Sequence, residues 1–298
     1  MKKIGILTLS LALLGCGENQ NSSQSSSTTS QSTATTSTSL SLRSLNQSQT
    51  CQYNFDATQQ DYDDWNNQNS GYMPITIFPI IDGQKFSFSV LPFTEEEFSY
   101  ISYISTTKAQ LSGTNNDGDF TLPKSGIIAL EMQLKVPKKL SENSSYISDI
   151  SLRAITGNGY TVDSNFGFQS GTYDPDFGEN PSNLNYSLSS RLSDGTGPTS
   201  TYFQYINMTN NPISYQRLGI YINQESKQVG FILNGIDKGY QSNLPAILEN
   251  ISFNIRSGVA IEFDPENEQK FSSELITDRN ALQFTYPQGT TDMCGNII

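Results

Sequence analysis

Three acidic residues stand at alternate positions late in the chain, Glu262, Asp264 and Glu266, in the run Glu-Phe-Asp-Pro-Glu. A pair of carboxyl groups beside a sugar is the arrangement with which most glycosidases hydrolyse a glycosidic bond. The chain contains no histidine, which excludes histidine-dependent triads, histidine general bases and the usual zinc hydrolase motifs. Paired carboxylates are therefore the main catalytic groups that this sequence offers.

This run resembles the Glu-x-Asp-x-Glu strand of the laminarinase-like retaining glycoside hydrolases, whose fold is a concanavalin-like jelly roll. The resemblance implies that Glu262 is the nucleophile and Glu266 the general acid, about 5 to 5.5 Å apart on one concave face with Asp264 between them. Pro265 has no N–H for a strand ladder, and the polar residues that follow predict a loop. The alternative is that the strand ends near Asp264 and the three carboxylates have no catalytic role.

A second acidic run, Asn-Asn-Asp-Gly-Asp, places Asn115, Asp117 and Asp119 at alternate positions, where their oxygens could bind calcium. An EF-hand loop counted from Asn115 would need glycine at its sixth position and glutamate at its twelfth, where this chain has Phe120 and Gly126. A plain polar turn is the alternative. The sequence suggests no other cofactor.

Residues 165–183 are expected to form a long connection that carries aromatic and acidic side chains among glycines and prolines. Aromatic faces beside carboxylates suit sugar recognition, and loops often carry function. The alternative is that the aromatic side chains only pack the loop against the domain. The candidate ligand-binding residues are Phe168, Tyr173, Asp174, Asp176 and Phe177.

Most of the elements that must position these residues are predicted to be β-strands. The clearest lies between residues 128 and 136, where apolar side chains alternate with Ala129, Glu131, Gln133 and Lys135, a pattern that predicts a half-buried strand. Residues 57–66 are the only expected helix, with Asp56 as its cap. Further strands are expected at residues 86–90, 150–155, 184–192, 202–208 and 250–256, whereas residues 94–105 favour neither state clearly.

The segment from residue 217 to residue 263 predicts consecutive hairpins. Two alternating runs flank a loop at residues 224–227, Asn234-Gly235 supplies a tight turn, and two more strands follow a loop at residues 242–245. The run LGIYINQESKQVGFILNGIDKGYQSNLPAILENISFNI resembles the C-terminal half of SPRY and related concanavalin-like domains. We therefore expect an all-β, antiparallel, concanavalin/SPRY-like jelly-roll sandwich with a short N-terminal helix.

The chain opens with two lysines and a short apolar run, too short to span a membrane, followed by Gly15 and Cys16. The run Leu-Leu-Gly-Cys resembles the lipobox of bacterial lipoproteins. The resemblance implies a signal peptide at residues 1–15, lipidation of Cys16 and, because Gly17 replaces the aspartate of inner-membrane lipoproteins, an outer-membrane location. An ordinary signal peptide cut elsewhere is the alternative. The whole chain also resembles uncharacterised proteobacterial lipoproteins.

The predicted organisation after the anchor is a Ser/Thr-rich tether at residues 16–50, too poor in apolar residues to fold, and one β-sandwich domain at residues 51–298. Once Cys16 is lipidated, Cys51 and Cys294 are the two remaining cysteines, and an oxidising compartment predicts that they form a disulfide. With 29 acidic and 17 basic residues the net charge is −12, which makes nucleic acid a poor partner.

Three functions remain open from the sequence. The first is a noncatalytic binding domain, held on the membrane by its lipid, that recognises a glycan or another envelope protein. The second is a glycoside hydrolase that uses Glu262 and Glu266. The third is a structural or adhesive surface protein whose only chemistry is its anchor and its disulfide.

Overall fold

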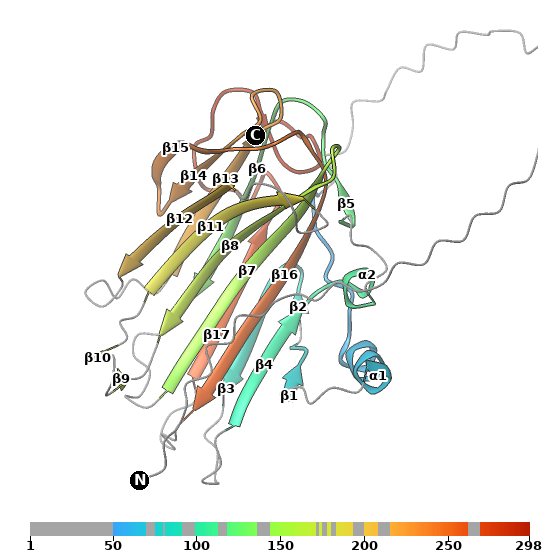
Figure 1. The fold of residues 1–298 in the computed structure, drawn as a ribbon, viewed down its shortest axis with the longest axis vertical. Helices are drawn as coiled ribbons and strands as arrows, with labels where there is room; N and C mark the ends of the chain where they lie inside the picture. Colours follow the sequence, from blue (N-terminus) through green and yellow to red (C-terminus); the bar gives the residue numbers. More distant parts are fainter. Residues whose placement is uncertain are drawn as a thin grey trace, which may run out of the picture. The chain divides into compact units, whose positions relative to one another are not determined.

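The computed structural model describes residues 50–69, 75–79, 81–90, 99–112, 118–135, 144–170, 173–174, 178–179, 183–192, 200–207, 215–261 and 269–298. Their strands form two large sheets that pack face to face around one core, called sheet A and sheet B below (Figure 1). The fold class that the sequence predicts, an all-β jelly-roll sandwich, is confirmed. In this part of the chain, no helix combines the length and the apolar character that crossing a bilayer requires.

Neighbouring strands run antiparallel except in the short pairs β1–β4 and β18–β6. Across sheet A the order is β1 (Ile75–Ile77), β4 (Ser99–Ser105), β16 (Leu248–Ile261), β7 (Ser144–Thr156), β8 (Tyr160–Ser170), β11 (Asn183–Leu192) and β12 (Ser200–Asn207), with β5 (Phe120–Thr121) also paired to β16. Across sheet B it is β15 (Ile236–Asn243), β14 (Gln228–Leu233), β13 (Tyr215–Asn223), β6 (Ile127–Lys135), β17 (Gln269–Ile276), β3 (Lys85–Val90) and β2 (Ile81–Asp82), with β18 (Thr290–Thr291) paired to β6. The remaining elements are α1 (Gln59–Asn69), α2 (Lys108–Leu111) and the two-stranded pair β9 (Tyr173–Asp174) and β10 (Gly178–Glu179).

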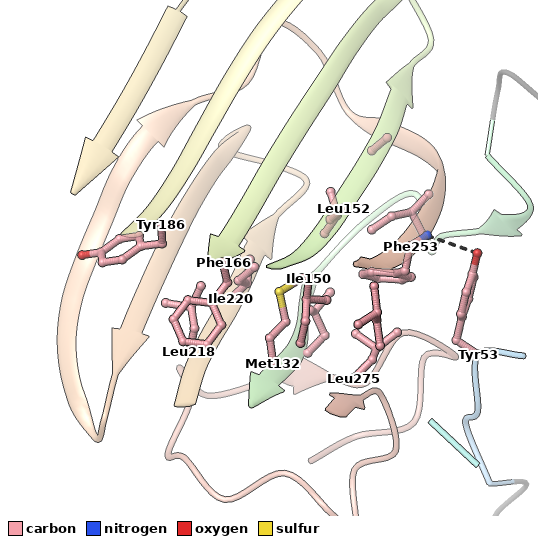
Figure 2. Packing of buried hydrophobic residues seen from close by; sticks show 14 of the residues in the cluster. Tyr53, Met132, Ile150, Leu152, Phe166, Tyr186, Leu218, Ile220, Phe253 and Leu275 are labelled. Atoms are coloured by element: carbon pink, nitrogen blue, oxygen red, sulfur yellow. Dashed lines mark hydrogen bonds between the residues drawn. The ribbon is translucent and has the colours of Figure 1, made fainter. Parts of the chain in front are cut away.

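The core lies between the inner faces of the two sheets (Figure 2). Ile150, Phe166 and Phe253 of sheet A face Met132 and Leu275 of sheet B, and each of the five is at most 1% exposed. Burying such a side chain contributes about 1.5 to 3 kcal/mol relative to leaving it in water. The alternation of apolar and polar residues along each strand therefore determines which face turns inward.

A buried group of three serines also links the sheets. Ser257 of β16 donates a hydrogen bond to Ser148 of β7 at 2.8 Å, and Ser148 lies 3.1 Å from Ser273 of β17. Because Ser257 takes an inward position between apolar residues, β16 continues as one strand of 14 residues. The expectation of two strands in this region was wrong for that reason.

The N-terminal helix begins later than the sequence suggests. Thr58 and Asp61 form a reciprocal cap at the start of α1, because Asp61 N–H donates to the Thr58 hydroxyl and Thr58 N–H donates to the Asp61 carboxylate. Asp56, the expected cap, instead accepts the N–H of Lys108 at the start of α2. Asp56 is thus engaged with α2, and the cap of α1 is Thr58, two positions further along the chain.

The predicted turns of the C-terminal hairpins are confirmed. Residues 224–227 join β13 to β14, and Asn234 and Gly235 adopt φ angles of 49° and 83° between β14 and β15. The loop expected at residues 242–245 starts later, since β15 continues to Asn243. The side chain of Gln224, 1% exposed, bonds the backbone of Leu248 and Pro123, so the first hairpin loop is fastened to the domain.

The predicted disulfide joins Cys51 to Cys294 across 243 positions. Next to it, the Thr277 hydroxyl donates to the Cys51 carbonyl at 2.7 Å, and Cys51 N–H donates to the Asp278 carboxylate at 3.1 Å. The beginning and the end of the described domain are thus fastened side by side.

Tyr53, two residues after Cys51, bonds β16 where, among the described residues, that strand has no strand neighbour on the side of β4 and β5. Its hydroxyl accepts the N–H of Phe253 at 3.1 Å, as Figure 2 shows, and Gln110 donates to the Phe253 carbonyl at 3.2 Å. These bonds lie between the residues of β16 that pair with β5 and those that pair with β4. Two side chains therefore replace a strand neighbour at this point.

The C-terminal segment, residues 277–298, covers part of the outer face of sheet B. Phe284 and Tyr286 pack against Ala129, Tyr221 and Ile232. A Cβ atom on Gly219 would lie 2.7 Å from both Phe284 and Tyr286, so glycine lets the segment approach the sheet closely.

Glu131, at an outward position of β6, is fully buried beneath this segment. Its carboxylate binds Arg217 and accepts hydrogen bonds from the N–H groups of Gln283 and Phe284 and from the Tyr286 hydroxyl, each at 2.9 Å. Burial and the neighbouring Glu131 carboxylate together raise the pKa of Tyr286. The expectation that β6 exposes one face is therefore wrong at Glu131, because its acid group holds the covering segment.

Candidate functional site

The residues predicted to catalyse hydrolysis, Glu262, Asp264 and Glu266, lie outside the described residues, and β16 is described as far as Ile261. Of the calcium candidates, Asn115 and Asp117 also lie outside. Asp119 is described, and its two carboxylate oxygens accept hydrogen bonds from the Tyr53 hydroxyl at 2.7 Å and the Thr107 hydroxyl at 2.6 Å. Asp119 thus holds Tyr53 and the N-cap of α2 in place.

The predicted aromatic loop begins later than expected, because β8 continues to Ser170. Phe168 is 2% exposed and belongs to the core, so it is corrected from a ligand-binding candidate to a packing residue. Tyr173 and Asp174 form β9, and their side chains lie outside the description, as do Asp176 and Phe177.

The structure does bring together a different set of polar residues, on the outer face of sheet A. Asp149 and Ser151 of β7, Asn165 of β8, and Asn254 and Arg256 of β16 form what we call the polar face. Arg256 is the register partner of Asp149, while Asn254 and Asn165 are the partners of Ser151 on either side. Neighbouring strands are about 4.8 Å apart, so the five side chains share one compact area near the middle of the sheet.

The polar face is built around Asp149. Its carboxylate lies 3.7 Å from Nε of Arg256 and accepts a hydrogen bond from the Ser151 hydroxyl at 3.4 Å. Asn165 donates to the same hydroxyl at 3.4 Å. The Asp149 side chain is 17% exposed and that of Arg256 is 43% exposed. Burial raises the pKa of Asp149, and the attraction of Arg256 opposes that shift.

Two features leave this area open to a further hydrogen-bonding group. The amide oxygen of Asn254 is buried and has no hydrogen-bond partner among the described residues. Gly167, the register partner of Asp149 on β8, contributes no side chain beside the carboxylate. Buried polar atoms are nearly always paired, so the Asn254 oxygen is a position at which a water molecule or another hydroxyl group can complete the hydrogen bonding.

The flanks of the polar face differ from its centre. Arg153 and Asp163 form an ion pair at 2.8 Å further along β7 and β8, and Phe203 of β12, 58% exposed, stands two strands beyond Asn165 in the same row. Asp163 is the register partner of Arg153. Arg153 lies four positions along β7 from Asp149, so Asp149 and Asp163 are separated by about 13 Å along the strand direction. This exceeds the roughly 5 to 9.5 Å between the two carboxyl groups of glycosidases. Asp149 and Asp163 therefore do not have the spacing of a glycosidase pair.

One group of described side chains has the proximity of a metal site, namely Cys51, Asp292 and Cys294. Both sulfurs are joined in the disulfide, and the Asp292 carboxylate accepts N–H groups of Cys294 and Asn296 at 3.0 and 2.9 Å. Its donor atoms are therefore used within the chain, and the group fastens the C-terminal turn.

The chain belongs to the family described as a domain of unknown function, DUF4882, whose model matches residues 30–296. A search of curated proteins finds no match to the chain.

Several solved structures are similar in overall architecture. A native glycosidic hydrolase shares 12% identity and covers 69% of this chain and 84% of its own, at a TM-score of 0.37. Porphyranase B from Zobellia galactanivorans shares 14% identity over 70% and 84% of the two chains, with a TM-score of 0.35. A β-glucanase from Bacillus licheniformis shares 10% identity over 70% and 86%, with a TM-score of 0.34.

Proposed function

We propose that this protein is an outer-membrane lipoprotein, anchored through Cys16, whose jelly-roll domain binds a glycan without cleaving it. The observation that carries the binding proposal is the polar face, where a largely buried carboxylate, an arginine and two amide side chains meet on the outer surface of sheet A. The anchor and the location rest on the sequence resemblance of Cys16 and its neighbours to a lipobox.

A glycan suits the polar face because hydroxyl groups both donate and accept hydrogen bonds. A hydroxyl can donate to the unpaired oxygen of Asn254, and another can accept from Arg256 while donating to Asp149. Leaving a buried polar atom unpaired costs about 1 to 3 kcal/mol, so a ligand that pairs Asn254 recovers part of that energy. The exposed ring of Phe203 offers an apolar surface for the C–H groups of a further sugar ring.

The spacing of Asp149 and Asp163 does not fit a glycosidase pair, which supports a noncatalytic role for the polar face. The hydrolase alternative depends instead on Glu262 and Glu266. It is tested directly by incubating the full chain with β-glucan and measuring reducing ends. Cleavage that Glu262→Gln abolishes would replace the binding proposal by that alternative.

A glycan array tests the binding proposal. The full chain should bind at least one glycan class, and Asn165→Ala and Asn254→Ala should each weaken binding about tenfold, the loss expected from one or two hydrogen bonds. Asn243→Ala on exposed β15 is the matched control and should bind as the parent does. Equal binding by all three variants would place the ligand elsewhere, and the absence of any bound glycan would favour a structural or adhesive role.

The anchor is tested separately. Cys16→Ser should release the protein from the membrane fraction while leaving the Cys51–Cys294 disulfide intact, as measured by fractionation and by thiol labelling under denaturing conditions. Continued membrane association of that variant would contradict lipidation.

A further inference from the structure

A second feature lies on the opposite side of the sandwich, where the C-terminal segment leaves part of sheet B uncovered. It is a groove of about 360 Å³ on the outer face of the sheet. Strands β3, β17, β6 and β13 contribute its lining, which consists of Lys85, Gln133, Tyr215, Ser272, Ser273 and Glu274.

The strand register fixes the order of the groups along the groove. Glu274 is the partner of Lys85 on one side and of Gln133 on the other, and Gln133 is in turn the partner of Arg217. In the next row, Ser272 and Tyr215 are both partners of Lys135, from opposite sides. The groove therefore presents an ammonium, a carboxylate, an amide and a hydroxyl on one sheet surface, with an aromatic ring at its end.

Gln133 is held in position by buried neighbours. Arg217 donates from Nη1 to its amide oxygen at 3.2 Å and from Nη2 to the Ala281 carbonyl at 2.9 Å, and its Nε binds the fully buried Glu131. With the oxygen of Gln133 engaged, its two amide N–H bonds remain for another partner. A buried ion pair costs desolvation energy and is weak evidence for stability alone, whereas here it also fixes a side chain that lines the groove.

The two charged groups of the groove, Lys85 and Glu274, do not form an ion pair with each other. Lys85 and Glu274 stand opposite on neighbouring strands, yet no ion pair within 4.0 Å joins them in the described part of the chain. The ring of Tyr215 is also accessible, since the residue is 46% exposed. The groove thus combines free donors, free acceptors and one aromatic surface.

We propose that this groove is a saccharide-binding site, separate from the polar face, that takes one or two sugar rings. The volume lies at the small end of the roughly 300 to 1,000 Å³ range of ligand pockets. Sugar hydroxyls match the mixture of donors and acceptors, because they accept from Gln133 and Lys85 and donate to Glu274. The apolar side of a sugar ring packs on Tyr215.

This site does not depend on the polar face. The polar face lies on the outer face of sheet A and the groove on the outer face of sheet B, so the two sheets separate the two sites. If both bind, a glycan layer engages the domain from two sides, and avidity exceeds the affinity of either site.

Isothermal titration of the full chain with cellobiose, chitobiose and lactose tests the proposal. At least one disaccharide should bind with a millimolar Kd, and Tyr215→Ala and Gln133→Ala should each weaken it about tenfold. Tyr215→Phe keeps the ring and should stay within about threefold of the parent. Asn165→Ala changes only the polar face and should bind equally well at the groove.

Two results would overturn the proposal. One is the failure of all three disaccharides to bind. The other is binding that Tyr215→Ala and Gln133→Ala leave unchanged, with urea midpoints showing that the variants are folded. Sensitivity to Asn165→Ala alone would sustain the polar face and reject the groove, so the failures of the two sites are distinguishable.

Discussion

Replacing Tyr53 by phenylalanine removes one hydroxyl and tests whether side chains complete the edge of β16. That hydroxyl accepts the N–H of Phe253 at 3.1 Å and an amide N–H of Gln110 at 2.9 Å, and it donates to Asp119 at 2.7 Å. Tyr53 is 3% exposed and Phe253 is 1% exposed. Water therefore cannot easily replace the lost partner of the Phe253 N–H.

The expected cost is dominated by that one N–H. Leaving a buried donor unpaired costs about 1 to 3 kcal/mol, whereas exposed Asp119 and the partly exposed Gln110 can turn to water. Gln110 also keeps its bond to the Phe253 carbonyl. We therefore expect Tyr53→Phe to lower the free energy of unfolding by about 1 to 3 kcal/mol.

Urea unfolding of the full chain measures this loss, provided that the slope with urea is unchanged. Tyr103→Phe is the matched control, since Tyr103 is 6% exposed and its hydroxyl has no hydrogen-bond partner among the described residues. Its loss should stay within about 0.5 kcal/mol. Equal losses for the two variants would refute the role assigned to Tyr53.

Three further predictions concern charge and covalent structure. Glu131→Gln should destabilise the domain by about 3 to 5 kcal/mol in urea unfolding because Arg217 loses its buried partner, whereas exposed Glu225→Gln should have little effect. Replacing both Cys51 and Cys294 by serine should lower stability by about 2 to 5 kcal/mol, and a thermal midpoint equal to that of the parent would contradict a structural disulfide. Burial raises the pKa of Asp149, so folding favours its protonated form and its contribution to stability is lost as pH rises through the folded-state pKa. The unfolding free energy of Asp149→Asn relative to the parent should therefore increase between about pH 3 and pH 7, and a constant difference would contradict the pKa shift.

Features set by neighbouring residues were predictable from the sequence. The Asn234-Gly235 turn and the loop at residues 224–227 depend on local backbone preferences, and both are confirmed. The helix cap was misassigned because Asp56 and Thr58 both precede a helical run, and contacts with α2 decide between them. The break expected in β16 is absent because Ser257 bonds Ser148 of β7, which is 109 positions away. Ser148 in turn lies next to Ser273 of β17, which is 125 positions from it.

The polar face was not predictable because its residues come from the consecutive strands β7 and β8 and from β16, which lies much later in the chain. Asp149 and Arg256 are 107 positions apart, and only the register of β7 and β16 makes them neighbours. The available signal was the polar residues at alternate positions of predicted strands, which are typical of any solvent-facing side. The candidates chosen instead were local runs, and Phe168 was among them although its alternation with Phe166 is that of a core strand.

Nuclear magnetic resonance tests directly whether the polar face binds a glycan. The full chain, labelled with nitrogen-15, would be titrated with the glycan that the array identifies, and the backbone amide shifts mapped onto the structure. If the polar face is the binding site, the largest changes are expected at Ser151, Asn165 and Asn254. Shift changes that spare all three residues at saturating glycan would contradict it.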